Sequence, residues 1–135
     1  MSEQNKELVR RYYDQVINGR DLDAVDTFFA DARVVEGVRH GCFSYFTAFP
    51  DLHVSLDELI AEGDSVFLRS TLTGTHDGEY KGIPATGRHI ASEAAEVFRI
   101  GDGKFVGYWC LTNVAGIMRQ ITEEQAVGAA HAVAG

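Results

Sequence analysis

The sequence predicts one α+β domain, with helices packed on one face of a curved antiparallel sheet. Three observations predict this class. Apolar residues recur at helical spacing before Pro50 and alternate with polar residues at strand spacing after it. Glycine-containing turns separate the alternating segments, as in an antiparallel meander. The chain has 135 residues, 45% of them hydrophobic, which is enough for one domain with its own core.

Two helices are expected in the first 30 residues. Between Asn5 and Asn18 the apolar residues fall on one helical face: Leu8, Val9, Tyr12, Tyr13, Val16 and Ile17. Asn18-Gly19 predicts a left-handed stop to this helix. Asp21 can cap the next helix. Its buried stripe is Leu22, Val25, Phe28 and Phe29.

The segment before Pro50 predicts a short strand and a further helix. Ala32 to Glu36 is typical of a short strand, and Cys42 to Phe49 of a short aromatic helix that Pro50 ends.

Four strands follow Pro50. The first contains Leu52, Val54 and Leu56 in alternation, and the others are Ser65 to His76, Arg88 to Ile100 and Lys104 to Thr112. Turns are expected at Glu62-Gly63-Asp64 and Gly101-Asp102-Gly103, and a loop at Asp77 to Gly87. A closing helix is expected over Val114 to Ile121. We expect residues 1–121 to form the domain and the Ala- and Gly-rich residues 122–135 a flexible tail.

Charge and composition exclude several classes of partner. The 12 basic and 20 acidic residues give a net charge of −8, and no basic run is longer than Arg10-Arg11. Nucleic acids and anionic membranes need a basic surface, so neither partner is expected. The polar start of the chain is not typical of a signal peptide. Cys42 and Cys110 are expected as free thiols, and the protein as cytoplasmic.

Motifs for phosphate binding, serine hydrolysis and metal binding are missing. No glycine-rich phosphate loop or G-x-S-x-G elbow occurs. His40-Gly41-Cys42 lacks the second ligand pair of a zinc site, so no metal is expected. A cofactor-free activity or a binding role remains.

Glu96 is the polar residue most out of place. In the third strand the even-numbered side chains include Ile90 and Phe98, which predicts that this face is the inner one. A carboxyl group buried there has a raised pKa and can take or give a proton near neutral pH. Alternatively, Glu96 pairs with Arg69 on the neighbouring strand or lies at a dimer surface. Ser92 and Ala94 on the same face are small and leave room for a ligand.

Other candidate residues come from the fourth strand and the helices. Tyr108 can donate a hydrogen bond to a ligand carbonyl, whereas Trp109 favours a core position and Cys110 that of a small buried hydrophobe. Asn113 is expected either to cap the last helix or to place its amide in the pocket. Tyr13, Tyr45, Phe46 and Phe98 join Ser92, Trp109 and Cys110 as expected substrate contacts. The histidines His40, His53, His76, His89 and His131 are expected in solvent.

Several short motifs occur together: Gly19-Arg20-Asp21-Leu22-Asp23-Ala24, Phe49-Pro50-Asp51-Leu52, Ala61-Glu62-Gly63-Asp64, Leu72-Thr73-Gly74-Thr75-His76 and Phe98-Arg99-Ile100. In this combination the chain, from about Asn5 to Ile121, resembles the SnoaL-like polyketide cyclases of the nuclear transport factor 2-like superfamily. The resemblance implies a cone-shaped fold around a deep apolar pocket, dimerisation through the sheet, and cofactor-free ring closure by intramolecular aldol condensation with an aspartate as acid/base.

The chain departs from the family pattern at the fourth strand. The family usually has Glu-His-Trp-Asp and then a further aspartate there. Gly107-Tyr108-Trp109-Cys110 and Asn113 stand in their place. Glu96 aligns with a position that is often aspartate in the family, and it is the leading acid/base candidate.

Three hypotheses follow. The first is a cyclase or isomerase of secondary metabolism that uses Glu96 as acid/base, with Tyr108 and Asn113 polarising a substrate oxygen. The second is a non-catalytic ligand-binding or partner protein, and the third an epoxide hydrolase that uses Glu96, Glu93 and Arg69.

Overall fold

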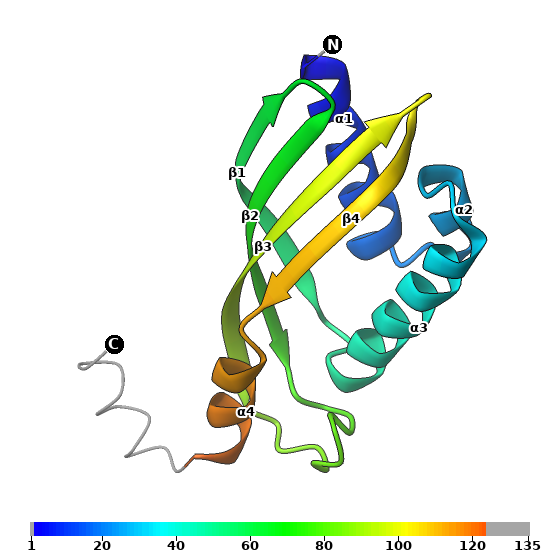
Figure 1. The fold of residues 1–135 in the computed structure, drawn as a ribbon. Helices are drawn as coiled ribbons and strands as arrows, with labels where there is room; N and C mark the ends of the chain where they lie inside the picture. The colour runs from blue at the N-terminus through cyan, green and yellow to red at the C-terminus, as the bar shows by residue number, and fades with distance from the viewer. Residues whose placement is uncertain (1, 124–135) are drawn as a thin grey trace.

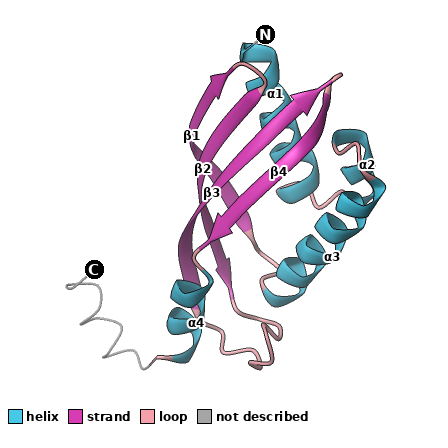
Figure 2. Ribbon diagram, viewed as in Figure 1, coloured by secondary structure: helices cyan, strands magenta, loops and turns pink. Residues whose placement is uncertain are grey.

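The computed structural model describes residues 2–123, and these form helices packed against one four-stranded sheet (Figures 1 and 2). The expected fold class is confirmed. A flexible tail was expected over residues 122–135. Residues 124–135 lie outside the described residues. Among the described residues, no helix is both long and apolar enough to cross a membrane.

The N-terminal helix ends in a widened turn. It comprises α1 (Ser2–Tyr12) and the π-helical turn η1 (Tyr13–Ile17). The left-handed residue expected at Gly19 is instead Arg20, with φ 64°. Gly19 is required for a different reason, because a Cβ there would lie 2.4 Å from the Gln15 carbonyl oxygen.

Two short helices, η2 (Leu22–Ala24) and α2 (Val25–Phe28), follow this turn. The Asp21 side chain accepts a hydrogen bond from Gln15 rather than capping η2, so the predicted cap is wrong.

The strand expected at Ala32 to Glu36 is also wrong. These residues begin α3 (Ala32–Ala48), one helix that absorbs the shorter aromatic helix predicted near its end. The Asp31 side chain accepts a hydrogen bond from the Arg33 amide and caps it. Val34 and Val35 favour a strand locally, but Val35, Val38, Cys42 and Tyr45 follow at helical spacing, and burial of that stripe outweighs the weak local preference.

The sheet is an antiparallel meander in the order β1-β2-β3-β4. Its strands are β1 (His53–Glu62), β2 (Ser65–Thr75), β3 (His89–Gly101) and β4 (Lys104–Thr112). The turns at Gly63 and at Asp102-Gly103 have positive φ, as expected for tight hairpins. The helix α4 (Val114–Thr122) then docks on β3, where the Gln120 side chain pairs with both backbone groups of Ala91.

The inner face of the sheet, defined as the face toward α1 and α3, holds the core. Phe98 and Phe105 are its centre, with ring centroids 4.6 Å apart, and Tyr12 packs edge-on against both. Trp109 lies on the opposite, outer face and is 53% exposed, so the predicted core position is wrong. β4 is an edge strand, and its odd-numbered residues from Trp109 onward face away from the helices.

His76 is fully buried and packs against Phe49, contrary to the expectation of a solvated histidine. Its Nδ1 accepts a hydrogen bond from the Thr86 amide, which fixes the return of the loop between β2 and β3.

Candidate active site

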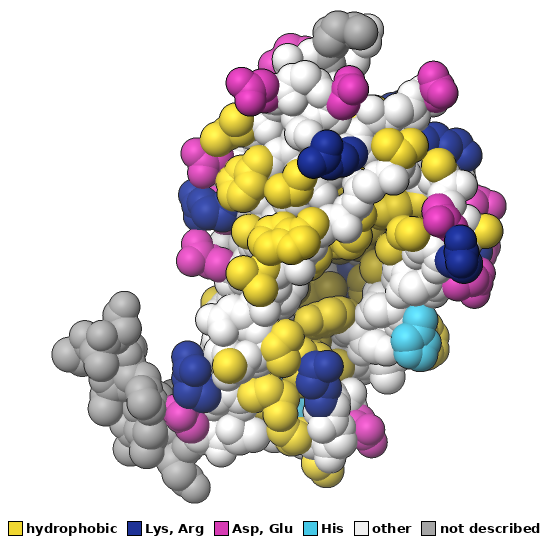
Figure 3. All heavy atoms as spheres, in the orientation of Figure 1, with side chains coloured by type: hydrophobic (Ala, Val, Ile, Leu, Met, Phe, Trp, Pro, Cys, Tyr) yellow, Lys and Arg dark blue, Asp and Glu magenta, His cyan; other side chains and the backbone are white. Residues whose placement is uncertain are grey.

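A cavity of about 410 Å³ lies between α3 and the inner face of the sheet, with the end of α1 and η1 at its back. Hydrophobic side chains gather along its opening (Figure 3). Its apolar walls are Ile17, Val34, Val38, Phe46, Leu52, Val54, Leu72 and Ala94. Its polar or ionisable side chains are Tyr12, Tyr13, Cys42, Tyr45, Glu96, Tyr108, Cys110 and Thr112. Glu96 is the one carboxylic acid among these lining residues.

Strand register places the polar groups together. Glu96 on β3 lies opposite Cys110 on β4, with Phe98 opposite Tyr108 on one side and Ala94 opposite Thr112 on the other. Directly opposed residues of antiparallel strands share a face, so all these side chains point toward the helices. The Glu96 side chain is buried, with 6% of the residue exposed.

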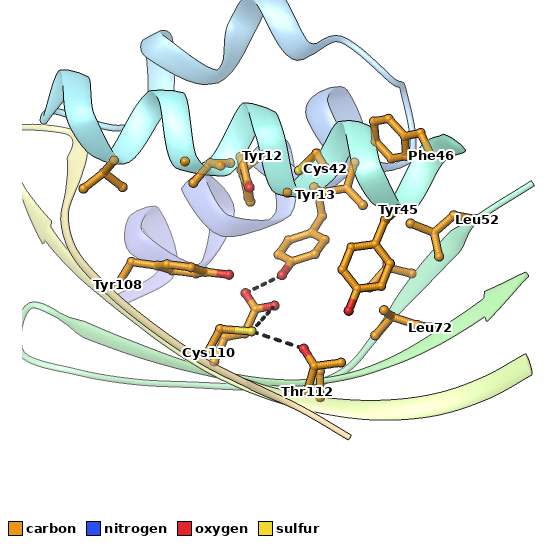
Figure 4. Close-up of a pocket in the computed structure, with 18 residues that line it drawn as sticks. Tyr12, Tyr13, Cys42, Tyr45, Phe46, Leu52, Leu72, Tyr108, Cys110 and Thr112 are labelled. Atoms are coloured by element: carbon orange, nitrogen blue, oxygen red, sulfur yellow. Dashed lines mark hydrogen bonds between the residues drawn. The ribbon is translucent and has the colours of Figure 1, made fainter. Parts of the chain in front are cut away.

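The two Glu96 carboxylate oxygens have different partners (Figure 4). The Tyr13 hydroxyl donates a short hydrogen bond to Oε2. Oε1 is contacted by the Cys110 thiol at 3.8 Å, a weak donor at a long distance. The Cys110 sulfur in turn lies 3.4 Å from the Thr112 hydroxyl oxygen. Oε2 is therefore held by a strong donor, whereas the contact of Oε1 with the thiol is weak.

Tyr13 reaches the carboxylate from the first residue of the π-helical turn. Both Tyr12 and Tyr13 are buried, and their rings meet edge to face with centroids 5.2 Å apart. Short π-helical insertions often occur at functional sites. Here Tyr12 packs into the aromatic core, while Tyr13 meets Glu96.

Burial dominates the electrostatics of the site. It raises the pKa of Glu96 above its ordinary value, while hydrogen bonding from Tyr13, Tyr108 and Cys110 acts in the opposite direction. Burial and the nearby Glu96 charge raise the pKa of Tyr13 and of Tyr108 well above the usual value. Burial also raises the pKa of the Cys110 thiol. The site is thus one proton-accepting carboxyl surrounded by groups that keep their protons.

Arg69 does not pair with Glu96. Its guanidinium lies on the outer face, 3.0 Å from Glu93 and within 4 Å of Asp57 and Glu58. The sequence hypothesis of a Glu96–Arg69 pair is therefore wrong, and Glu93 and Arg69 are separated by the sheet from the Glu96 carboxyl. Together they cannot form the carboxylate and arginine set that an epoxide hydrolase would need.

The remaining predicted site residues divide into two groups. Tyr45 and Phe46 line the cavity, together with Tyr13, Tyr108 and Cys110. Asn113 caps α4, its side chain accepting from the Gly116 amide at 2.9 Å, so capping is the alternative that the structure shows. Ser92 donates to the Asn113 carbonyl oxygen and Phe98 is packed in the core, so neither lines the cavity. Trp109 faces away from it.

Sequence reasoning missed Tyr12, Cys42 and Thr112 as lining residues. Thr112 could have been found, because it shares the alternation of Tyr108 and Cys110. Cys42 could also have been found, because it lies one helical turn before Tyr45 and Phe46 in the helix predicted over 42–49. Among residues 2–123, no three His, Cys, Asp or Glu side chains are placed to hold a metal ion together.

Known proteins share this fold. TsrD from Streptomyces laurentii is 27% identical with a TM-score of 0.79, and the alignment covers 90% of this chain and 97% of TsrD. AclR from Streptomyces galilaeus, a proposed hydroxylase, is 25% identical with a TM-score of 0.79, covering 98% and 92%. A protein of Jannaschia sp. CCS1 assigned to the SnoaL-like polyketide cyclases has the same identity and TM-score, covering 91% and 94%.

A search of curated proteins found no match. A family model described as SnoaL-like polyketide cyclase matches residues 7–121, most of the chain. Because this match covers most of the chain, the chain belongs to the SnoaL-like polyketide cyclase family.

Proposed function

We propose that this protein is a cofactor-independent cyclase or isomerase that moves protons on a polyketide-like or other polycyclic aromatic substrate. The observation that carries the proposal is Glu96, a buried carboxyl that lines an apolar cavity, with one oxygen held by Tyr13 and the other contacted by the weakly donating Cys110 thiol. Burial raises the pKa of this carboxyl toward the range in which a general acid/base works.

In the proposed reaction, the Glu96 carboxylate takes a proton from a carbon next to a substrate carbonyl. The electron pair of the broken C–H bond forms an enolate, whose oxygen accepts a hydrogen bond from Tyr108. In a cyclisation, the enolate carbon attacks a second carbonyl of the same molecule, and the new alkoxide takes the proton back from Glu96. In an isomerisation, that proton returns to a different carbon. Neither route consumes an oxidant or a cofactor.

The apolar walls contribute by folding the substrate. Holding both reacting carbons in contact can lower the barrier by roughly 7–11 kcal/mol in well-oriented intramolecular reactions. The family aspartate expected at position 110 is a cysteine in this chain. Because burial raises the thiol pKa, we assign the base to Glu96 and give Cys110 only a supporting contact.

The experiment is exchange of the α-protons of 2-tetralone, a flat ketone, in deuterated buffer, followed by proton NMR. Wild-type protein should accelerate exchange over buffer, and Glu96→Gln should reduce the acceleration at least about 100-fold, the usual contribution of a general base. Glu93→Gln is the matched control, because Glu93 lies on the same strand but on the exposed outer face.

Each outcome is informative. If the Glu96→Gln variant accelerates proton exchange as much as the wild-type protein does, Glu96 is not part of the mechanism. Binding of the ketone without any accelerated exchange would favour the alternative of a ligand-binding protein of the same fold.

We propose in addition that a second copy of the chain covers the outer face of the sheet. Three apolar side chains of β4 are more than half exposed there: Val106, Trp109 and Leu111. Trp109→Ser with Leu111→Ser should convert a dimer to a monomer in light scattering after gel filtration. Phe43→Ser, which removes an equally exposed apolar residue from α3, should leave the dimer intact.

We also propose a cytoplasmic location, supported by the free thiols of Cys42 and Cys110. Alkylation of both thiols in freshly lysed cells, measured by intact mass, would support it.

A further inference from the structure

Arg20 joins three segments of the chain beside the cavity. Its guanidinium donates hydrogen bonds to the backbone carbonyl oxygens of Ile17, Pro50 and Leu52, at 2.8, 2.9 and 2.7 Å. Its Cζ atom also lies 4.5 Å from the centroid of the Phe46 ring, which is a cation–π contact. This one side chain thus links the end of η1, the connection between α3 and β1, and α3 itself.

Three of these four partners line the cavity. Ile17, Phe46 and Leu52 belong to its apolar wall, whereas Arg20 is not a lining residue. Phe46 and Leu52 lie at the end of the cavity away from Tyr108 (Figure 4). Arg20 therefore supports this wall from behind, and it can affect a ligand only through the residues that it holds.

The backbone conformation at position 20 suits a glycine better than an arginine. Arg20 has φ 64°, in the left-handed region that residues with a Cβ adopt at a cost. A strained residue persists where the surrounding contacts stabilise it. Here these contacts belong to the guanidinium, whose flat fork can bind several carbonyls while its face covers a ring. The side chain, rather than the backbone, therefore explains an arginine at this position.

The contacts of Arg20 hold the wall in one shape. The Ile17 carbonyl belongs to the last residue of η1, a helix end at which a cation is favourable. The same guanidinium ties this helix end to the Leu52 carbonyl and to the Phe46 ring. Without Arg20, a ligand would have to order these wall residues as it binds, and that ordering weakens binding.

We propose that Arg20 is a positioning residue of the binding site, which holds the wall of Ile17, Phe46 and Leu52 in the shape that receives a flat aromatic ligand. The inference rests on the proposed function, because that function places the substrate in this cavity. It adds a determinant of affinity that lies outside the cavity and does not contact Glu96.

Binding of 2-naphthol, measured by isothermal titration calorimetry, tests the inference without turnover. Arg20→Gln removes the guanidinium and should weaken binding roughly tenfold, because the freed wall must be ordered. Arg20→Lys keeps the charge and can still donate to carbonyl oxygens but lacks the flat fork, so its affinity should lie between the two. Arg20→Gly suits the positive φ and so protects the fold, yet it should also bind roughly tenfold more weakly.

Arg39→Gln is the matched control. Arg39 also donates to two backbone carbonyl oxygens, those of Leu22 and Asp23, at 2.9 and 3.2 Å. None of these three residues lines the cavity. Arg39→Gln should therefore change the affinity for 2-naphthol by less than about twofold, although it also removes arginine contacts from the fold. If Arg20 only stabilised the fold, the two glutamine variants would behave alike.

A double-mutant cycle shows whether Arg20 acts through Phe46. Phe46→Leu should weaken binding several-fold in the wild-type protein but by less than about twofold in Arg20→Gln, where the ring is no longer held. The inference is overturned by unchanged affinity in Arg20→Gln, by an equal loss in Arg39→Gln, or by equal effects of Phe46→Leu in both backgrounds. Absence of 2-naphthol binding by the wild-type protein overturns it as well. Because no catalysis is measured, these outcomes stand apart from loss or retention of proton exchange in Glu96→Gln.

Discussion

The two faces of the strand β3 place two glutamates, three residues apart, in opposite surroundings. Glu93 on the outer face is exposed and lies 3.0 Å from Arg69, within a group of exposed charges. Glu96 on the inner face is buried, contacts no cation among the described residues, and has Tyr13 and Cys110 as partners. The first carboxylate is hydrated and has a counter-ion. Burial without a counter-ion makes the second one able to exchange a proton at higher pH.

The largest expected effect concerns packing on the two faces. Phe98 on the inner face packs against four other aromatic rings, whereas its neighbour Val97 lies on the outer face beside Trp109. Phe98→Ala should lower the free energy of unfolding by about 3–5 kcal/mol, and Val97→Ala by about 1 kcal/mol or less. Urea denaturation measures both. Similar losses in the two variants would mean that side chains pack as tightly on the outer face as in the core on the inner face.

The next effect concerns the partner that holds Glu96. Tyr13→Phe removes a donor that stabilises the carboxylate, so the pKa of Glu96 should rise further. Since the base is the deprotonated form, the pH at which tetralone exchange is half-maximal should move upward, so exchange should fall on the acidic side of the profile and recover at higher pH. Tyr12→Phe is the control, and its profile should stay in place. A uniform loss at every pH would instead indicate that Tyr13 acts on the substrate.

A smaller effect is expected on the stability of the fold. The way that stability changes with pH distinguishes Glu96 from Glu93. The pKa of Glu96 is higher in the folded than in the unfolded state, so between these two values the unfolded chain binds fewer protons and stability falls as pH rises. At pH 8 the Glu96 charge therefore destabilises the fold. Glu96→Gln should raise Tm by several degrees at pH 8 and by little at pH 4. Glu93→Gln should give no such gain, which circular dichroism at several pH values can measure.

The smallest effect is expected at Arg69. Its ion pairs with Asp57, Glu58 and Glu93 are exposed, where solvent and salt screen them. Arg69→Gln should change Tm by about 2 °C or less, and the change should shrink further in 1 M salt. A larger, salt-resistant drop would show that this part of the outer face is shielded from solvent.

Much of the fold could be predicted from the sequence, because local patterns are sufficient for it. Strict alternation in the third strand placed Glu96 on the face shared with Phe98, and the Gly101-Asp102-Gly103 turn fixed the hairpin that follows. The same alternation predicted a buried carboxyl with a raised pKa. These properties depend on neighbours along the chain and on the period of a strand.

The identity of the groups around that carboxyl was decided only by the tertiary structure. Tyr13 meets Glu96 across 83 positions of sequence, and Tyr45 on α3 and Thr112 on β4 line the same cavity. Trp109 was misjudged for the same reason: residue type does not reveal that β4 is an edge strand. Hydrophobic periodicity determines which face of an element is buried, but the partners across a cavity depend on how the elements pack in three dimensions.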